Sequence, residues 1–450
     1  LAQLGRDARG RLASWGIERG DVLAAAVPDR VECAATLAIL PASSTLALFD
    51  PTLSVDDFVA LIRRVGAKAA VVPAGGNHAL REAARRLGVA EVEMAPDGSA
   101  EAGSFGLALR RPAASLDGAR RLDARWAYIG ATSGTTGQPK LVPHGHRQLL
   151  VTARAMGARL SMTHDDVSGH LTPLHLANGL RTALMLAVLN GGSVRCLPEA
   201  DAGALLDAID EDAITYVSAS FTILREVIER VRASRRPRRG RLRFIRAASG
   251  RLEPHEFALL ERAFGVPAIT GLGATETGMM LHQRLPPAQR TPGSVGDPIA
   301  SEIRIVGDDG RDVAPGDVGE LQVRGPQVFD GYLDAPALNT ATFVDGWFRT
   351  GDLGRFDPSG DVHLVGRATE VINRGGEKLA PLQIDAVLRA IPGVSDAAAF
   401  GIPHPRLGQE VVAAIVRDPG VPLTEAEVQS SARAALGLRR APRHVWFVDA

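Results

Sequence analysis

The chain has 450 residues, and its 51 Lys+Arg are balanced by 51 Asp+Glu, so the formal net charge is zero. A neutral balance argues against a nucleic-acid-binding protein or a polybasic membrane anchor, and a composition of 45% hydrophobic and 23% charged residues excludes wholesale disorder. The cysteines, Cys33 and Cys196, are too few for a disulfide scaffold or a zinc ribbon and favour a reducing, cytoplasmic location. The longest uncharged apolar stretch, near 183–189, is far short of a membrane span, and no signal-peptide pattern opens the chain, so we expect no integral membrane association.

Short β-rich runs alternate with amphipathic helices along the first two-thirds of the chain. Strands are predicted at 22–27, 69–72, 214–218, 242–247 and 266–270, and helices at 30–40, after a capping box at 54–57, at 221–231 and at 254–264. This alternation predicts an α/β fold with a doubly wound sheet. Ligands bind beyond the carboxyl ends of the strands in such sheets, so the segments after Ser218, Ala247 and Thr270 are expected to wall a site.

The densest charged run is rich in arginine and extends from Arg230 to Arg246, between a predicted helix and a predicted strand. In a protein with no net charge, such a run is more typical of a solvated surface loop than of an RNA-binding site. The sequence therefore predicts a surface loop here.

The pattern changes past residue 300. Short strands at 302–306, 320–324 and 362–365 are separated by Gly/Asp/Pro turns, which predicts an antiparallel or barrel-like β subdomain. A glycine hairpin at 374–376, a helix opened by Pro381, strands at 397–400 and 411–416, and a last helix with a capping box at Thr424 and Glu427 predict a small α+β unit. We expect a large N-terminal domain, residues 1–366, and a smaller mobile C-terminal domain, residues 367–450.

The first stretch with chemical character spans residues 128–140 and reads YIGATSGTTGQPK. A β-like run enters a loop of hydroxyl and glycine residues that Lys140 closes; its members are Thr132, Ser133, Gly134, Thr135, Thr136 and Gly137. Glycines let backbone N–H groups approach an anion, hydroxyls add donors, and lysine adds a mobile charge. The loop therefore predicts a phosphate cradle that is not a Walker A loop, with a plain Ser/Thr/Gly surface loop as the alternative.

The second stretch, GLGATET at 271–277, follows the last predicted strand of the α/β region. A hydroxyl and a carboxylate at the carboxyl end of a strand, Thr275 and Glu276, can hold a Mg²⁺–phosphate group. The alternative is a strand-to-helix turn that Glu276 caps. A dinucleotide-binding loop is disfavoured because its third glycine is missing.

Two later stretches complete the set. The first, GWFRTGD at 346–352, ends in Asp352, and a carboxylate that accepts two hydroxyl hydrogens is suited to hold a ribose. The second, GRATEVINRGGEKLAP at 366–381, contains Gly375 and Gly376, which would let a narrow arm pass close to the backbone. Taken singly, the first stretch is more typical of a turn aspartate before Leu353, and the alternative for the second is a surface hairpin with two turn glycines.

In order and separation, the four stretches resemble the signature motifs of the adenylate-forming (AMP-binding) superfamily, which comprises acyl-CoA synthetases, peptide-synthetase adenylation domains and luciferases. Residues 329–333, FDGYL, and the segment 373–381 look like stand-alone acyl-CoA synthetases, while 244–249 and 292–296 resemble the oxalate–CoA-ligase-like branch. The chain departs from the family at Leu272, where an aromatic residue is usual, and at Thr369, where the hinge is usually Asp or Lys.

The resemblance implies a two-step reaction with ATP, Mg²⁺ and coenzyme A, in which a small-molecule carboxylic acid, whose size the sequence leaves open, becomes an acyl-adenylate and then a thioester. It implies that Lys140 and its loop hold phosphates, Thr275 and Glu276 hold the metal and the α-phosphate, and His175 faces the acyl carboxylate, although a structural role for His175 is equally open. The remaining nucleotide- and thiol-binding residues implied are Gly250, Arg251, Leu252, Gly273, Ala274, Asp352, Arg367, Gly375, Gly376 and Lys378. The expected acyl-pocket residues, mostly small, are Val217, Ser218, Ser220, Ala248, Gly271 and Ala274.

Two alternatives stay open at this point. One is an adenylation domain that loads a carrier-protein thiol, and the other is a non-catalytic module that binds ATP or an acyl-adenylate. The family carries a late lysine that acts in adenylation, whereas no lysine follows Lys378 in this chain. Because both ends of the chain look cut, a fragment is the expected reason.

Overall fold

The computed structural model describes residues 1–27, 31–98, 102–114, 120–132, 139–197, 201–234, 240–248, 250 and 252–449. The chain forms two compact units. The first comprises Leu1–Arg290, Pro298–Glu302 and Arg324–Phe343, and the second comprises Thr291–Asp297, Ile303–Val323 and Val344–Ala450. The units do not divide at residue 366, and the domain boundary expected there stays a prediction.

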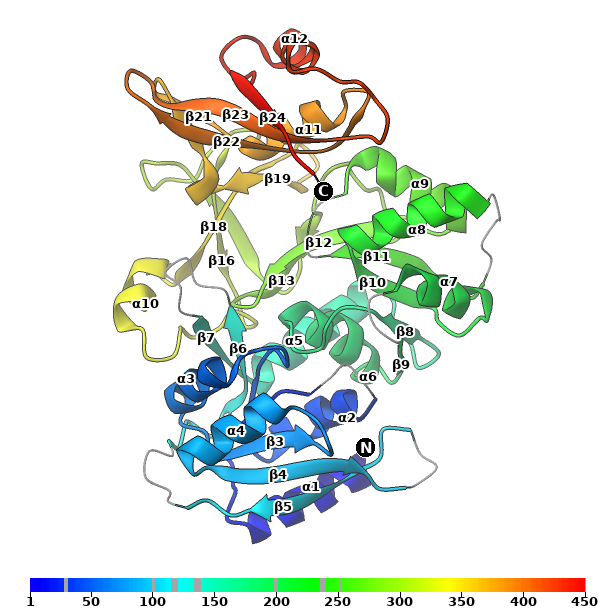
Figure 1. Cartoon of the computed structure of the whole chain (residues 1–450), viewed down its shortest axis with the longest axis vertical. Coiled ribbons are helices and arrows are strands. Elements are labelled where there is room, and N and C mark those ends of the chain that lie inside the picture. Colours follow the sequence, from blue (N-terminus) through cyan, green and yellow to red (C-terminus); the bar gives the residue numbers. More distant parts are fainter. Residues whose placement is uncertain are drawn as a thin grey trace. The chain divides into compact units, whose positions relative to one another are not determined.

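The first unit contains a seven-stranded sheet in the order β5-β4-β3-β1-β2-β6-β7 (Figure 1). Its strands are β1 (Val22–Ala25), β2 (Thr45–Leu48), β3 (Ala69–Pro73), β4 (Ala90–Pro96), β5 (Phe105–Arg111), β6 (Trp126–Thr132) and β7 (Lys140–Gly145). The inner pairs are parallel, and β5 and β7 join the two edges in antiparallel fashion. Wholly buried strands such as β1 and β2 are typical of a parallel sheet covered on both faces.

Helices cover both faces of this sheet because successive strand residues point to opposite sides. Leu23 and Ala25 pack with α1 (Ala2–Ser14) and α2 (Val31–Ile39), and the turn η1 (Leu40–Ala42) follows α2. Val22 and Ala24 pack on the other face with α3 (Val55–Val65) and α4 (His78–Leu87). The predicted capping box at the start of α3 is confirmed, since Ser54 and Asp57 bond each other's backbone N–H.

A second seven-stranded sheet runs in the order β14-β13-β12-β11-β10-β8-β9. Its strands are β8 (Val167–His170), β9 (Ser193–Cys196), β10 (Tyr216–Ser220), β11 (Phe244–Ala248), β12 (Ala268–Ala274), β13 (Gly278–His282) and β14 (Asp297–Pro298). Strands β9-β8-β10-β11-β12 are parallel, and β13 returns antiparallel to β12.

One face of this sheet packs against α7 (Ala202–Asp210), α8 (Phe221–Ser234) and α9 (Pro254–Phe264), drawn in green in Figure 1. The other face, which carries Tyr216, Phe244 and Ile269, packs against α5 (His146–Arg159) and α6 (Leu186–Val188), while the π-helix η2 (Gly179–Met185) lies against β8 and β10. A π-helical turn is rare and often marks a functional site.

Two expectations for this region need correction. Strand β12 runs on to Ala274, because Gly271–Ala274 pair with β13, so Thr275 and Glu276 lie in a hairpin turn rather than at a strand-to-helix turn. The arginine-rich run is not a surface loop at its end, because Arg246 lies in β11 with 2% of its surface exposed and Arg243 forms an ion pair with the buried Asp166. Residues 235–239 of that run lie outside the described residues.

The second unit contains two five-stranded sheets. In the antiparallel sheet β15-β16-β18-β17, β19 pairs with β18; the strands are β15 (Glu302–Val306), β16 (Gly319–Arg324), β17 (Phe343–Val344), β18 (Trp347–Phe356) and β19 (Val362–Arg367). The other sheet has the order β21-β20-β23-β22 with β24 on β23; its strands are β20 (Ile372–Arg374), β21 (Glu377–Leu379), β22 (Val394–His404), β23 (Gly408–Arg417) and β24 (His444–Phe447).

Helices α11 (Pro381–Arg389) and α12 (Glu425–Leu436) cover the second of these sheets over an apolar core, and the predicted capping box at Thr424 and Glu427 is confirmed. The turn η3 (Ala368–Glu370) precedes β20, and α10 (Pro336–Thr342) belongs to the first unit. The predicted α/β class with a smaller α+β C-terminal part is thus confirmed. In the described part of the chain, no helix is both long and apolar enough to span a bilayer.

Candidate active site

The predicted phosphate loop joins the antiparallel strands β6 and β7. Thr132, the last residue of β6, pairs with Lys140, the first residue of β7, so the loop is the tip of a β-hairpin. The Nζ atom of Lys140 lies 5.3 Å from the centre of the Tyr332 ring, within cation–π range. Five predicted loop residues lie outside the described residues: Ser133, Gly134, Thr135, Thr136 and Gly137.

Tyr332 joins this hairpin to the turn that carries Thr275 and Glu276. Its hydroxyl donates a 2.9 Å hydrogen bond to Oε1 of Glu276, and the main-chain oxygen of Glu276 accepts a 2.8 Å bond from the N–H of Phe329. The structure therefore brings Lys140 and Glu276 to the same aromatic side chain. Tyr332 was not among the expected site residues, although its segment, 329–333, carried part of the family resemblance.

A buried arginine holds the turn in place through hydrogen bonds to its main-chain carbonyls. Arg181, on η2, donates hydrogen bonds of 3.0 Å to the carbonyl of Ala274 and 2.9 Å to that of Thr275. Burial lowers the pKa of Arg181 to about 10, so the side chain stays cationic near pH 7, and the nearby charge of Glu276 favours the cation. Arg181 was not among the expected site residues. The signal that could have identified it is a charged side chain at the start of an apolar helical run.

His144 contacts both Arg181 and the Thr275–Glu276 turn. Its Nε2 atom lies 2.8 Å from Nη2 of Arg181 and 2.6 Å from the carbonyl oxygen of Thr275. Burial and the neighbouring Arg181 hold the pKa of His144 well below its usual value, which keeps the ring neutral. The buried Nδ1 atom has no hydrogen-bond partner among the described residues.

The expected acyl-carboxylate residue, His175, contacts Asp50 and Tyr128 in the first unit. Its Nε2 is 3.8 Å from Oδ2 of Asp50, and its carbonyl accepts a long, 3.4 Å bond from the hydroxyl of Tyr128. Neither contact reaches Glu276 or Thr275, and the role of His175 stays a prediction.

The expected adenine-pocket segment is only partly described. Gly250 has φ +155°, and a Cβ built on it would lie 2.0 Å from Phe221, so a larger residue does not fit. Leu252 is buried, whereas Arg251 lies outside the described residues. Gly273 and Ala274, in β12, form the last pairs with β13 before the Thr275–Glu276 turn.

In the second unit, Asp352 and Arg367 face each other across strands β18 and β19. Nε of Arg367 lies 3.0 Å from Oδ1 of Asp352, and Arg367 also donates to the carbonyl of Thr350. Asp352 is 5% exposed, while the Arg367 side chain is about half exposed. The structure therefore pairs these two residues, and their expected role at a ribose stays a prediction.

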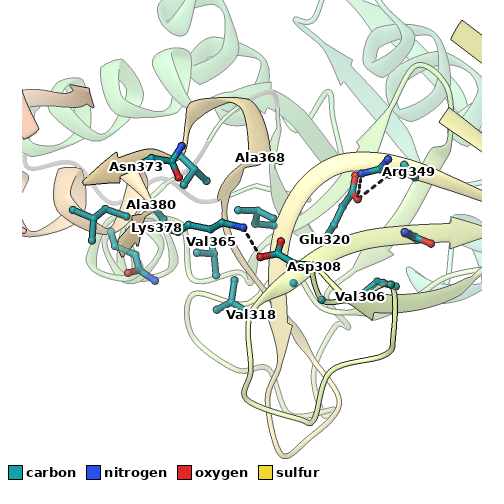
Figure 2. A pocket seen from close by; sticks show the side chains of 18 of the residues that line it. Val306, Asp308, Val318, Glu320, Arg349, Val365, Ala368, Asn373, Lys378 and Ala380 are labelled. Atoms are coloured by element: carbon teal, nitrogen blue, oxygen red, sulfur yellow. Dashed lines mark hydrogen bonds and ion pairs between the residues drawn. The ribbon is translucent and has the colours of Figure 1, made fainter. Parts of the chain in front are cut away.

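The glycine hairpin is also as predicted. Gly375 and Gly376 connect β20 to β21 with φ values of 59° and 85°, the left-handed conformations that a two-residue hairpin turn needs. Beyond the turn, Lys378 lines a pocket of about 980 Å³ within the second unit and forms a 2.5 Å ion pair with Asp308 (Figure 2). Glu320 and Arg349, also ion-paired, line the same pocket, as does Arg440.

The predicted residues are thus divided between the two units. Lys140, His175, Thr275 and Glu276 belong to the first unit, and Asp352, Arg367, Gly375, Gly376 and Lys378 belong to the second.

Comparison with known proteins identifies the family. Residues 5–333 match the AMP-binding enzyme family, and residues 383–450 match the AMP-binding enzyme C-terminal domain. The oxalate–CoA ligase of Arabidopsis thaliana is 34% identical over 96% of this chain and 86% of its own length, and the sulfoacetate–CoA ligase of Cupriavidus necator is 35% identical over 83% and 73%. The crystal structure of ATP-bound MatB from Rhodopseudomonas palustris superposes with a TM-score of 0.87 at 27% identity, covering 99% of this chain and 89% of that one.

The chain belongs to the AMP-binding enzyme family. Within this family it groups with acid–CoA ligases, so the suspected branch and the enzyme class inferred from the sequence, an AMP-forming acid–thiol ligase, are confirmed.

Proposed function

We propose that the chain activates a small carboxylic acid with ATP and transfers the acyl group to coenzyme A. In the first step, a carboxylate oxygen attacks the α-phosphorus of ATP, and the bond to pyrophosphate breaks. In the second, the thiol sulfur attacks the acyl carbon, the bond to AMP breaks, and the thiol loses its proton. The cluster of Lys140, Tyr332 and Glu276 carries the proposal, because it places a cation and a carboxylate at one strand-end site.

Catalysis of the first step needs positioning and charge neutralisation, as in phosphoryl transfer generally. Lys140 and the hydroxyl and glycine residues 132–137 would hold the β- and γ-phosphates. Arg181 donates hydrogen bonds to the carbonyls of Ala274 and Thr275. These bonds hold the turn that carries the Thr275 hydroxyl and the Glu276 carboxylate. This rigidity favours the proposed role at the α-phosphate.

Mg²⁺ would enter with ATP rather than reside in the protein. Within the described ranges, no group of three or more His, Cys, Asp or Glu side chains could hold a metal ion. Mg²⁺ is commonly bound by one or two carboxylates together with phosphates and water, so the single carboxylate of Glu276 fits an ion that ATP brings. Such an ion would neutralise charge that develops on the phosphates.

In the second unit, Asp352 would accept hydrogen bonds from the ribose hydroxyls, and Arg367 would orient its carboxylate. Gly375, Gly376 and Lys378 would line the path of the thiol arm. The cytoplasmic location expected from the cysteine content also stays a prediction.

Replacing Asp352 by Asn is expected to weaken ATP binding about 10-fold, because the amide offers one acceptor oxygen and no charge to the ribose and to Arg367. Isothermal titration calorimetry with Mg·ATP measures the change. Asp345→Asn is the matched control: Asp345 is exposed at φ 51°, a conformation that asparagine accepts, and its replacement should leave ATP affinity unchanged. Equal affinities for the wild type and Asp352→Asn would contradict the ribose role.

Incubation with Mg·ATP, coenzyme A and a panel of acids tests the reaction. The panel runs from oxalate and sulfoacetate, the acids named for two relatives, through acetate and benzoates to long-chain acids. Mass spectrometry is expected to show an acyl-CoA and AMP in equal amounts for one class of acid. Formation of AMP or acyl-adenylate without a thioester would indicate that the acceptor is a carrier-protein thiol rather than coenzyme A. ATP binding without any turnover would favour the non-catalytic binding module.

A further inference from the structure

A second buried arginine lies beside the expected acyl pocket. Arg246 donates hydrogen bonds of 2.8 Å to Oγ of Ser218 and 3.1 Å to Oδ1 of Asn178, and its Nε lies 3.2 Å from Nε2 of His282. Thr182 joins the group, since its hydroxyl lies 3.2 Å from Oγ of Ser218 and 3.1 Å from Oδ1 of Asn178. We call Arg246, Ser218, Asn178 and Thr182 the Arg246 cluster.

The hydrogen-bond partners of Arg246 carry no negative charge. Among the residues that the structure describes, these partners are Ser218, Asn178, His282 and Met279, and none of them is a carboxylate. Burial lowers the pKa of Arg246 to about 10, so the guanidinium is still protonated near pH 7. A buried cation without a counter-charge carries a large free-energy cost, which an anionic ligand would offset.

The sheet places this charge at the floor of the expected pocket. Ser218 and Arg246 are register partners on β10 and β11, and the next pair toward the carboxyl ends on the same face is Ser220 with Ala248. Gly271 follows on the same face of β12, and a Cβ built on it would lie within 3.1 Å of both His282 and Met279, the neighbours of Arg246. Small residues therefore lie between the guanidinium and the strand ends that carry Thr275 and Glu276.

The cluster also holds an unused donor. Oδ1 of Asn178 accepts from Arg246, which directs the Nδ2 group elsewhere, and this buried Nδ2 has no hydrogen-bond partner in the described part of the chain. Nη2 of Arg246, which makes one 3.7 Å contact with the sulfur of Met279, and Nδ2 of Asn178 remain as donors with no carboxylate bound to them, and such donors can bind a carboxylate or sulfonate.

We propose that the Arg246 cluster binds a second anionic group of the acid, so that the preferred substrates carry a carboxylate or sulfonate in addition to the reacting carboxylate. This inference rests on the proposed ligase function. It names Arg246 as the residue that determines specificity and Asn178 as the residue that supplies a further donor.

The test compares acids with one and two anionic groups, using Arg246→Met in the full chain. We expect kcat/KM for oxalate and sulfoacetate to fall about 100-fold, the size of the loss of a charge-assisted pair, with less than about a 3-fold change for acetate. Arg159→Met is the matched control, because Arg159 donates to main-chain carbonyls of His282 and Pro298 and lies outside the cluster, and it should leave the ratio between the acids unchanged. An equal loss for all acids, or a wild type that prefers acetate, would overturn the proposal.

Two further measurements separate this inference from the ligase reaction. Asn178→Ala keeps the guanidinium and should lower kcat/KM for oxalate about 10-fold while leaving kcat/KM for acetate unchanged. This variant replaces Arg246→Met in the test if Arg246→Met does not fold. Isothermal titration calorimetry measures the affinity of the site for oxalate in the absence of turnover. If the wild type binds oxalate but forms no thioester, and Arg246→Met abolishes the binding, the ligase function is rejected and the anion site is supported. If the wild type forms a thioester from acetate but not from oxalate or sulfoacetate, the anion site is rejected and the ligase function is supported.

Discussion

Replacing Glu276 by glutamine is expected to reduce ATP–pyrophosphate exchange about 1000-fold. The substitution keeps the shape of the side chain and an oxygen that can accept the Tyr332 hydroxyl, so the turn should persist. It removes the charge that we place beside the metal and the α-phosphate, and the loss of one well-placed electrostatic group commonly costs a factor of 100 to 1000 in rate, that is, about 3–4 kcal/mol. Exchange of radiolabelled pyrophosphate into ATP measures this step without the thiol.

The dependence on Mg²⁺ distinguishes a metal ligand from a structural residue. Glu276→Gln should require a higher Mg²⁺ concentration for half-maximal exchange. Tyr332→Phe removes only the hydrogen bond to the carboxylate, so its exchange rate should fall by less than about 10-fold. Glu226→Gln, at an exposed position on α8, is the control and should retain full exchange. More than a tenth of the wild-type rate in Glu276→Gln, at unchanged Mg²⁺ dependence, would exclude a role in the adenylation step.

The stability of the first unit is expected to fall as the pH drops below about 6.5, because of His144. Its pKa is lowered in the folded state, so the unfolded chain binds the proton first, and stability is lost as the pH falls through the unfolded value toward the folded one. For one histidine that stays neutral in the fold, the loss between pH 7 and pH 5.5 is about 1 kcal/mol. Urea unfolding at the two pH values measures it.

His144→Gln removes this titration while leaving an amide N–H that can donate to the carbonyl of Thr275. The variant should lose about 1 kcal/mol less than the wild type between the two pH values. His164→Gln serves as the control, since the His164 side chain is 81% exposed and its replacement should leave the pH dependence unchanged. If His144→Gln and the wild type show the same pH dependence, then burial and Arg181 do not keep the His144 ring neutral in the folded state.

Local sequence signals predicted much of the fold. The capping boxes at Ser54 and Thr424, the helix that Pro254 opens and the two-glycine hairpin at Gly375 all depend on residues within a few positions of one another, and all were confirmed. The strand at 268–274 was predicted too short, since its last four residues gain their hydrogen bonds from β13, a partner that no local pattern at Gly271 identifies.

The sequence by itself determined the class of this protein, because its four motifs resemble those of AMP-binding enzymes and its alternating strands and helices predict an α/β fold. Side-chain placement was decided only by the tertiary structure. Arg246 ends a charged run and lies in a predicted strand, but only the tertiary structure puts that strand at the centre of a sheet whose two faces are covered by helices, so the fold buries its charge. Tyr332, Arg181 and His144 meet the Thr275–Glu276 turn from segments distant in sequence, because buried polar groups find hydrogen-bond partners through space.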